Sequence, residues 1–158
     1  RVIIMEPMPG SRLPGAEISG FKGYIILEIL PQLAESTMCS TAKDVSNAGV
    51  LGTIALMMET SETGAHIVID RIPKPDSFSL IDWLKAFLSY GFVLCVDKQK
   101  SAGVIEMFTS KNITAGVIGT VTRERTFTVA YEGVHDTLFD LDREDITGIA
   151  RDSGLLNM

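Results

Sequence analysis

The sequence predicts an α+β domain in which a mixed β-sheet is layered against flanking helices. Short apolar segments rich in β-branched residues alternate with helical patterns along most of the chain, and two strand patterns near the end are spaced as a hairpin. Strands that alternate with helices favour helix-on-sheet layers, and the hairpin adds antiparallel pairing. The 158 residues, 46% of them hydrophobic, can bury one substantial core. We therefore expect a single domain over 1–158.

The first quarter of the chain combines a short strand, a loop and an interrupted helix. Residues 2–5 are apolar enough for a buried strand, and 6–22 are rich in proline and glycine, which predicts a poorly ordered loop. Residues 23–36 place apolar side chains at helical spacing. Pro31 falls inside that pattern and should kink or split the helix.

The middle of the chain repeats a helix-strand alternation. Residues 47–62 are apolar on most faces, which predicts a buried helix that stops at Gly64. Residues 65–70 alternate as a strand, and 77–88 form a helix that a serine can cap. A continuous apolar strand is expected at 91–96.

The last third contains one helix, three strands and a short final helix. The expected order is an amphipathic helix, a glycine-containing strand, a two-stranded hairpin with a glycine turn, and a terminal helix. The amphipathic helix is expected at 98–111 and the glycine-containing strand at 115–121. The hairpin strands are expected at 126–131 and 137–141, and the terminal helix at 143–150.

Charge and cysteine usage exclude several classes of protein. The net charge is −6 and the basic residues are scattered, so we expect no nucleic acid partner. No apolar run reaches the roughly 18 residues of a membrane-spanning helix, so no membrane association is expected. Cys39 and Cys95 lie in apolar surroundings without C-x-x-C spacing, which favours buried, reduced thiols in a cytoplasmic protein. The start at Arg1, directly before an apolar run, indicates a cut through a longer protein.

A polar stretch immediately before the 47–62 helix is the candidate functional site. Asp44, Ser46 and Asn47 supply oxygens where the backbone N–H groups of the helix start point outward, an arrangement that could hold a phosphate with its Mg²⁺. Gly49 and Gly52 would allow close backbone approach. Alternatively, Ser46 or Asn47 caps the helix, Asp44 favours its positive end, and the glycines serve packing. Spacing alone does not decide between these interpretations.

Other polar and aromatic residues have a structural and a functional interpretation. His66 and His135, the only histidines, are far apart in sequence, which argues against a shared role. Trp83, Phe87 and Tyr90 follow helical spacing and either seal a helix against the sheet or form a base-stacking wall; we favour packing. The acidic stretch 140–145 fits a solvated turn before the last helix better than a cation site.

Three segments together carry a resemblance to a known family. "KDVSNAGVLGTIALMMETSETGAHIVIDRIPKP", "WLKAFLSYGFVLCV" and "ITAGVIGTVT" resemble the C-terminal domain of AIR synthase-related proteins. The superfamily includes aminoimidazole ribonucleotide synthetase, selenophosphate synthetase, thiamine-monophosphate kinase and a hydrogenase maturation factor. The resemblance covers about 40–122 and is nearest to uncharacterised AIR-synthase-like proteins of the methanogenesis-marker type.

The resemblance implies a two-domain ATP-using enzyme of which this chain is the second domain. An N-terminal ATP-binding domain, absent from 1–158, would form a homodimer and much of the nucleotide site. The C-terminal domain would cover the cleft and contact phosphate and a small-molecule substrate. ATP and Mg²⁺ are the implied cofactors.

Matching positions assign roles to individual residues. Thiamine-monophosphate kinases carry Asp-x-Ser-Asp at the start of this helix, which corresponds to Asp44, Ser46 and Asn47. The resemblance implies that Asp44 and Asn47 contact metal and that Ser46 contacts ATP. We expect Lys43, Asn47 and Gly49 to join Ser46 at the nucleotide, because Lys43 can offset negative charge, Asn47 offers an amide and Gly49 allows close backbone approach.

Departures from the family patterns narrow the possible activity. Asn47 replaces a charged ligand, and Tyr90–Gly91 replaces an acidic pair of the thiamine-phosphate kinases. The chain ends in "GLLNM" rather than in the reactive cysteine of the maturation factor. We therefore expect an ATP-dependent enzyme that activates a small molecule by phosphoryl transfer, with no catalytic residue assigned. The alternative is a stand-alone small-molecule-binding or dimerisation module without catalysis.

Overall fold

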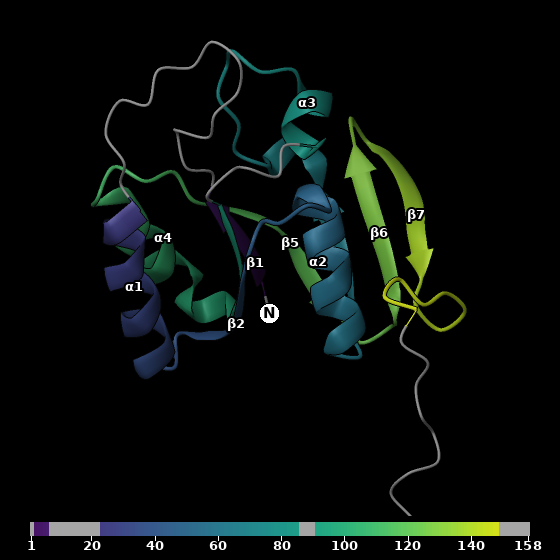
Figure 1. The fold of residues 1–158 in the computed structure, drawn as a ribbon, viewed down its shortest axis with the longest axis horizontal. Coiled ribbons are helices and arrows are strands. Elements are labelled where there is room, and N and C mark those ends of the chain that lie inside the picture. Colours follow the sequence, from purple (N-terminus) through teal and green to yellow (C-terminus); the bar gives the residue numbers. More distant parts are fainter. Residues whose placement is uncertain (1, 7–22, 86–90, 149–158) are drawn as a thin grey trace, which may run out of the picture.

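In the computed structural model, one seven-stranded mixed sheet organises the chain (Figure 1). The structure describes the backbone of residues 2–6, 23–85 and 91–148, and side chains within these ranges from Glu28 onward. The strand order is β2-β4-β1-β5-β3-β6-β7, and every neighbouring pair is antiparallel except β3 and β6. The strands are β1 (Val2–Glu6), β2 (Cys39–Asp44), β3 (Gly64–Val68), β4 (Phe92–Val96), β5 (Gly116–Thr122), β6 (Thr126–Tyr131) and β7 (Val134–Asp140). The expected mixed sheet is confirmed.

Within the described ranges, four α-helices flank this sheet. In Figure 1, α1 and α4 stand on one side of the central strands and α2 on the other, with the β6–β7 hairpin at the far right. The helices are α1 (Gly23–Glu35), α2 (Gly49–Thr60), α3 (Leu80–Lys85) and α4 (Ser101–Thr109). Short 3₁₀ helices occupy Ile69–Arg71 and Lys98–Lys100. No helix in the described ranges is long and apolar enough to cross a membrane.

Strand β4 shows how the helices divide between the two faces of the sheet. Val93 and Cys95 belong to the apolar cluster with α2 and α3, whereas Leu94 and Val96 belong to the cluster with α1 and α4. Successive side chains of a strand point to opposite faces, so β4 is covered on both. Its continuous apolar sequence is what a strand buried on both faces requires.

Among the described residues, the face beneath α1 and α4 is covered over only part of its width. The apolar cluster under these two helices contains side chains from β4 and the neighbouring parts of β2 and β5, but none from β3, β6 or β7. On those three strands this face carries His66, Thr128 and His135. We call the two parts of this face the covered half and the open half.

Helix α1 confirms the expected helix but not its interruption. It runs from Gly23 to Glu35 as one helix that contains Pro31, so it does not split there. The kink that the sequence offered as the other outcome stays a prediction. Pro31 is exposed. A carbonyl that loses its helical partner on the solvent side can bond to water, which lowers the penalty of an internal proline.

Helix α2 ends earlier than its sequence suggests. It stops at Thr60, and Glu62 adopts a positive φ of 52° in the turn that follows. Gly64 is instead the buried first residue of β3, where an added Cβ would collide with the carbonyl oxygens of Glu124 and Thr126. A glycine is needed here for close approach between strands rather than as a helix stop.

Capping and turn chemistry confirm two other expectations. The Asp82 amide donates to the Ser79 hydroxyl at 3.1 Å, and that hydroxyl donates to the Asp82 carboxylate at 2.6 Å, so a serine caps α3. The β6–β7 hairpin turns at Glu132 and Gly133, with φ of 48° and 80°. Two consecutive positive φ values are typical of the hairpin turns that match strand twist.

The short helix expected at 143–150 is absent from its described part, 143–148. The buried Glu59 carboxylate of α2 instead accepts the backbone amides of Ile146, at 2.6 Å, and Thr147, at 3.2 Å. These contacts hold the chain after β7 against α2. Amides bound to a side chain from another element are not available for a helical ladder, which explains the difference.

Candidate functional site

The polar stretch predicted as a site links β2 to α2. Strand β2 ends at Asp44, which pairs with Phe92 at the start of β4. The amide of Val45 then donates to the Gly91 carbonyl at 2.8 Å, and the amide of Ser46 donates to the hydroxyl of the buried Thr53 at 3.1 Å. The connection is therefore fixed at both sides, and it presents its polar side chains at one end of the sheet.

The start of α2 has no side-chain cap. The N-cap residue is Ala48, without a side-chain hydrogen bond, so neither Ser46 nor Asn47 caps the helix in the way that the structural alternative supposed. A helix start leaves up to four amides without helical partners and carries a partial positive charge. Phosphate groups suit such an end.

Gly49 has the packing role that the structural alternative gave it. It is buried, with a φ of 66°, and an added Cβ would collide with the Leu84 carbonyl oxygen of α3. Its amide donates to the Ser46 carbonyl at 2.8 Å. Glycine is required here because α2 begins against the backbone of α3, and because the positive φ suits no other residue as well.

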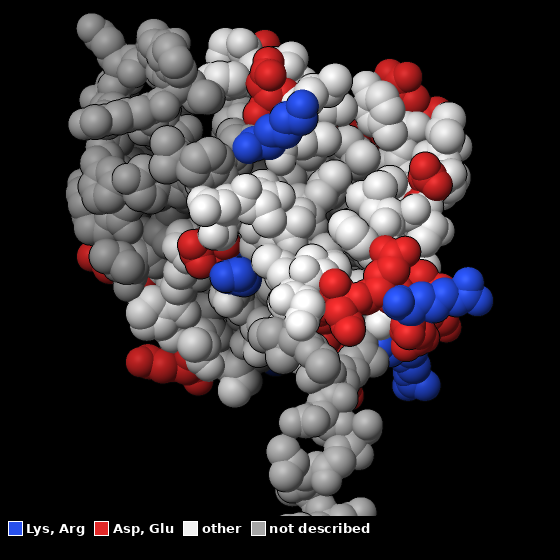
Figure 2. All heavy atoms as spheres, turned by 45° about the vertical axis from the view of Figure 1, so that its right-hand side comes forward, with Lys and Arg blue, Asp and Glu red and all other residues white. Residues whose placement is uncertain are grey.

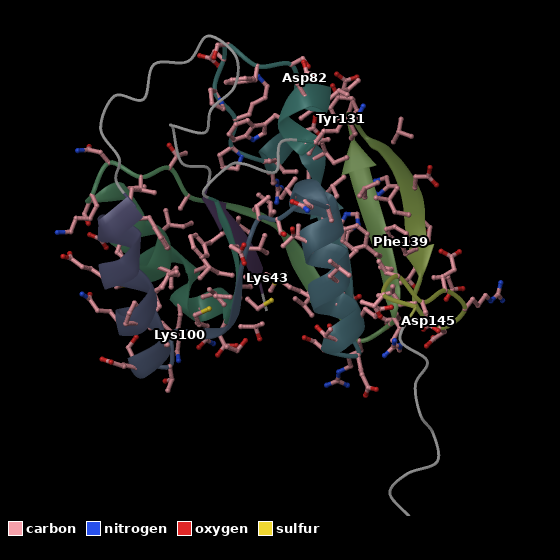
Figure 3. The ribbon with its side chains drawn as sticks, in the orientation of Figure 1. Lys43, Asp82, Lys100, Tyr131, Phe139 and Asp145 are labelled. Carbon is pink, nitrogen blue, oxygen red and sulfur yellow. The ribbon has the colours of Figure 1, made fainter. Side chains whose placement is uncertain are left out.

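The charged side chains of the stretch remain accessible. The Asp44 side chain is 66% exposed, and its carboxylate lies 3.8 Å from the Lys43 ammonium. Figure 3 places Lys43 on β2, between α1 and α2 in that view. Asn47 is exposed and Ser46 half-buried. An exposed ion pair at this distance contributes little stability, so both groups can be redirected to a ligand.

The donors at this end of the sheet fit part of a magnesium site. The Asp44 carboxylate and the Asn47 amide could supply two hard oxygen ligands, and Mg²⁺ commonly takes the remainder from phosphate and water. Within the described ranges, no three His, Cys, Asp or Glu side chains are grouped closely enough to hold a metal by themselves. These residues therefore fit a metal that arrives with a phosphate better than a permanent metal centre.

A small cavity lies between α1 and β2. Its volume is about 110 Å³, and its lining is Leu30, Leu33, Ala34, Cys39, Ser40, Thr41, Ala42 and Leu94. Pockets for drug-sized ligands are usually about 300–1,000 Å³. The cavity is too small and too apolar for a nucleotide.

The aromatic and acidic candidates are explained by structure where they are described. Trp83 is buried, donates its indole N–H to the Pro73 carbonyl at 2.9 Å, and packs against Phe78. Phe87 and Tyr90 lie outside the described residues.

The acidic stretch 140–145 forms a mostly exposed turn. Asp142 pairs with Arg125 at 2.9 Å, and Asp140 pairs with Arg143 at 3.3 Å. Acidic and basic side chains are mixed toward the lower right of Figure 2, and Figure 3 labels Asp145 in this region. The expectation of a solvated turn is confirmed, although no helix follows it within 143–148.

The two histidines lie together, contrary to what their sequence separation suggested. Their ring centroids are 5.5 Å apart and their planes differ by 12°. They stand on β3 and β7, with β6 between them. A period-2 pattern assigns each to a strand face, but only the strand order places β3 and β7 on either side of the same strand.

Comparison with known proteins identifies the family. The model of the AIR synthase related protein, C-terminal domain, matches residues 22–132. The chain belongs to this family. An uncharacterised protein of Methanocaldococcus jannaschii is 31% identical over 122 residues, and one of Synechocystis is 34% identical over 126 residues. The matches cover 77% and 80% of this chain but only 38% and 39% of the two relatives.

Solved structures confirm the fold of the AIR synthase related C-terminal domain. Phosphoribosylformylglycinamidine synthase II of Thermotoga maritima matches 89% of the chain with a TM-score of 0.71 and 19% identity, over 25% of its own length. PurL of T. maritima complexed with ATP gives a TM-score of 0.73 at 18% identity, also over 25% of its length. In a HypE–HypF complex, the match has a TM-score of 0.69 at 15% identity and covers 88% of this chain and 52% of the other.

Proposed function

We propose that this AIR synthase related domain is the C-terminal part of an ATP-dependent enzyme that activates a small molecule by phosphoryl transfer. The observation that carries the proposal is the start of α2, where an uncapped helix end adjoins the accessible Asp44 carboxylate. The family membership and the ATP complex of T. maritima PurL support ATP as the nucleotide. The domain would supply phosphate, metal and substrate contacts.

Each polar residue of the stretch has a role in this proposal. Mg²⁺, when bound with ATP, neutralises charge on the phosphates during transfer. Asp44 and Asn47 hold that ion with their oxygens. The Lys43 ammonium and the Ser46 hydroxyl bind phosphate oxygens, and Gly49 keeps the helix start in the position where its amides point at the ligand.

The proposal also includes the rest of the protein. The chain spans about two fifths of the curated relatives it matches, which leaves room for a further domain in proteins of that length. We propose that an N-terminal ATP-binding domain completes the nucleotide site and forms the homodimer. The 158-residue chain alone then has no Mg²⁺-dependent ATP hydrolysis. If the purified 158-residue chain hydrolyses ATP, and still does so after the Asp44 carboxylate is removed, the proposal that a second domain completes the site is contradicted.

The decisive experiment replaces Asp44 by asparagine in the full-length protein. Asp44→Asn keeps the shape and one oxygen but removes the charge that holds the metal. ATP-dependent turnover should fall at least tenfold, which equals about 1.4 kcal/mol of transition-state stabilisation. The melting temperature should stay unchanged because the side chain is exposed.

Asp97→Asn is the matched control. Asp97 is also exposed and also makes no capping hydrogen bond, but it follows the opposite end of β4. Its replacement should leave turnover unchanged. Equal turnover of the Asp44 variant and wild type at saturating Mg²⁺ would reject the metal role and favour a binding or dimerisation module instead.

A further inference from the structure

The open half of the sheet carries a pair of imidazoles that the proposed ATP site does not use. His66 lies beside Thr128 in the β3–β6 register, and His135 lies opposite Ala130 in the β6–β7 register. The small side chain of Ala130 leaves room above β6 for the two rings, which lie 5.5 Å apart. His66 is half-buried and His135 is exposed.

A hydrogen-bonded chain of atoms extends from one nitrogen of the His66 ring. Nδ1 lies 3.0 Å from the Thr128 hydroxyl, and which of the two donates depends on the tautomer of the ring. The hydroxyl also lies 3.3 Å from the Ala65 carbonyl, to which it can donate its only proton. When Nε2 binds a metal, the neutral ring carries its proton on Nδ1, and the Thr128 hydroxyl is placed to accept it.

This relay is the arrangement that orients histidine as a metal ligand. Metal-binding histidines usually donate their second ring N–H to an oxygen, which fixes the tautomer and raises the basicity of the ligating nitrogen. Here the relay runs from the His66 ring through the Thr128 hydroxyl to the Ala65 carbonyl. His66 is thus prepared to ligate through Nε2.

The spacing of the rings suits a shared ion. With metal–nitrogen bonds of about 2.1 Å, two imidazoles on one tetrahedral ion have ring centroids roughly 5 Å apart. The observed separation is 5.5 Å. The planes are nearly parallel, so one ring must turn before the in-plane lone pairs of both can meet at one ion. His135, which is exposed on the edge strand β7, can rotate to turn its nitrogen toward the ion held by His66.

From this geometry we propose that His66 and His135 form a two-histidine site for a divalent transition-metal ion such as Zn²⁺, completed by water or by a ligand from solution. A neutral ring that presents a lone pair attracts a cation, whereas an anion would need both rings protonated. Imidazole is a favoured ligand of zinc and its neighbours among the transition metals. The site lies on the opposite face of the sheet from α2 and is independent of the proposed phosphate contacts.

The test is a titration of the 158-residue chain with Zn²⁺ alone, in the presence of a phosphine reductant. Calorimetry should show one ion per chain. Because the chain has only two histidines, His135→Ala and His66→Ala each remove half of the imidazole ligands, and each should weaken binding at least tenfold. Thr128→Val keeps the shape but breaks the relay, and it should also weaken binding about tenfold.

Two controls separate this site from other zinc binding. Thr137→Val is matched to Thr128→Val, since Thr137 lies opposite Thr128 on the same face, but no hydrogen bond joins its side chain to either ring. The Thr137→Val variant should bind Zn²⁺ with the affinity of the wild type. A parallel titration with Co²⁺ should lack the near-ultraviolet thiolate band that binding to Cys39 or Cys95 would produce.

Some outcomes would overturn the proposal. Zn²⁺ affinity that is unchanged in His135→Ala, or the absence of saturable binding, rejects the site. Nitrogen NMR of the Zn²⁺-loaded chain that finds His66 still protonated on Nε2 also rejects it. If His66→Ala fails to fold, His135→Ala still decides, because that exposed side chain has no core role.

Discussion

The covered and open halves of one sheet face differ in what their strands bury. Under α1 and α4, Leu94 and Val96 meet Val104 and Phe108 of α4, and all four are fully buried. On the open half, the same face carries His66, Thr120 and Thr128, none of them fully buried. The sheet is continuous across both halves, so the helices rather than the strands determine which positions must be apolar.

The comparison teaches where the domain obtains its stability and where it can carry chemistry. Burial of apolar area contributes about 25 cal/mol per Å², and the covered half has that area on both sides of β4. In the open half, Phe127 and Val129 belong to the apolar cluster on the α2 face. Polar side chains are tolerated on its other face, which is therefore available for binding.

The largest expected effect on stability comes from a cavity-forming substitution in the covered half. Phe108 is fully buried between α4 and the sheet, and Phe108→Ala should lower the free energy of unfolding by about 3–5 kcal/mol, because it leaves a cavity. Thr120→Ala, at an exposed position of the open half, should change it by less than about 0.5 kcal/mol. Urea unfolding measures both. Similar values for the two variants would contradict the division into halves.

A smaller effect is expected at the glycine that brings β3 close to the chain before β6. Gly64→Ala places a methyl group against the Glu124 and Thr126 carbonyl oxygens, and it should cost about 1–3 kcal/mol through backbone displacement. Gly103→Ala in α4 is the control, and it should raise the free energy of unfolding instead of lowering it. Its added Cβ would lie 3.3 Å from the flexible end of Met38, and alanine favours a helix interior by about 0.5–1 kcal/mol. Equal destabilisation by both would show that Gly64 is not under steric constraint.

The smallest effect is kinetic and concerns the thiols of the two cysteines, Cys39 and Cys95. Burial raises the pKa of the Cys39 thiol, although backbone hydrogen bonds at Thr41 and Cys95 partly offset this. A raised pKa lowers the thiolate fraction at a given pH, so Cys39 should react with a maleimide more slowly at pH 8 than the same thiol in the urea-unfolded chain. Cys95, buried against α2, should react only on unfolding. Mass spectrometry of timed samples shows which cysteine is labelled. Labelling of Cys95 before Cys39 in the folded chain would contradict the prediction that Cys95 is the less accessible thiol.

The candidate site could be predicted only in part. The polar stretch before α2 was visible because acids and hydroxyls that precede an apolar helix form a local pattern. Its roles in phosphate and metal binding remain predictions. The absence of a cap at Ala48 and the contact of Gly49 with Leu84 could not be predicted, since both depend on how α2 begins against α3.

By itself the sequence determined the kinds of element and the layered fold class. A continuous apolar run marked β4 as a strand, and local turn chemistry placed the β6–β7 hairpin. Only the tertiary structure decided the strand order, the hydrogen bond from the Ile146 amide to the Glu59 carboxylate, and the ring contact between His66 and His135. Periodicity reports which face a residue occupies on its own element. Which residues from distant elements share that face depends on register and packing over the whole chain.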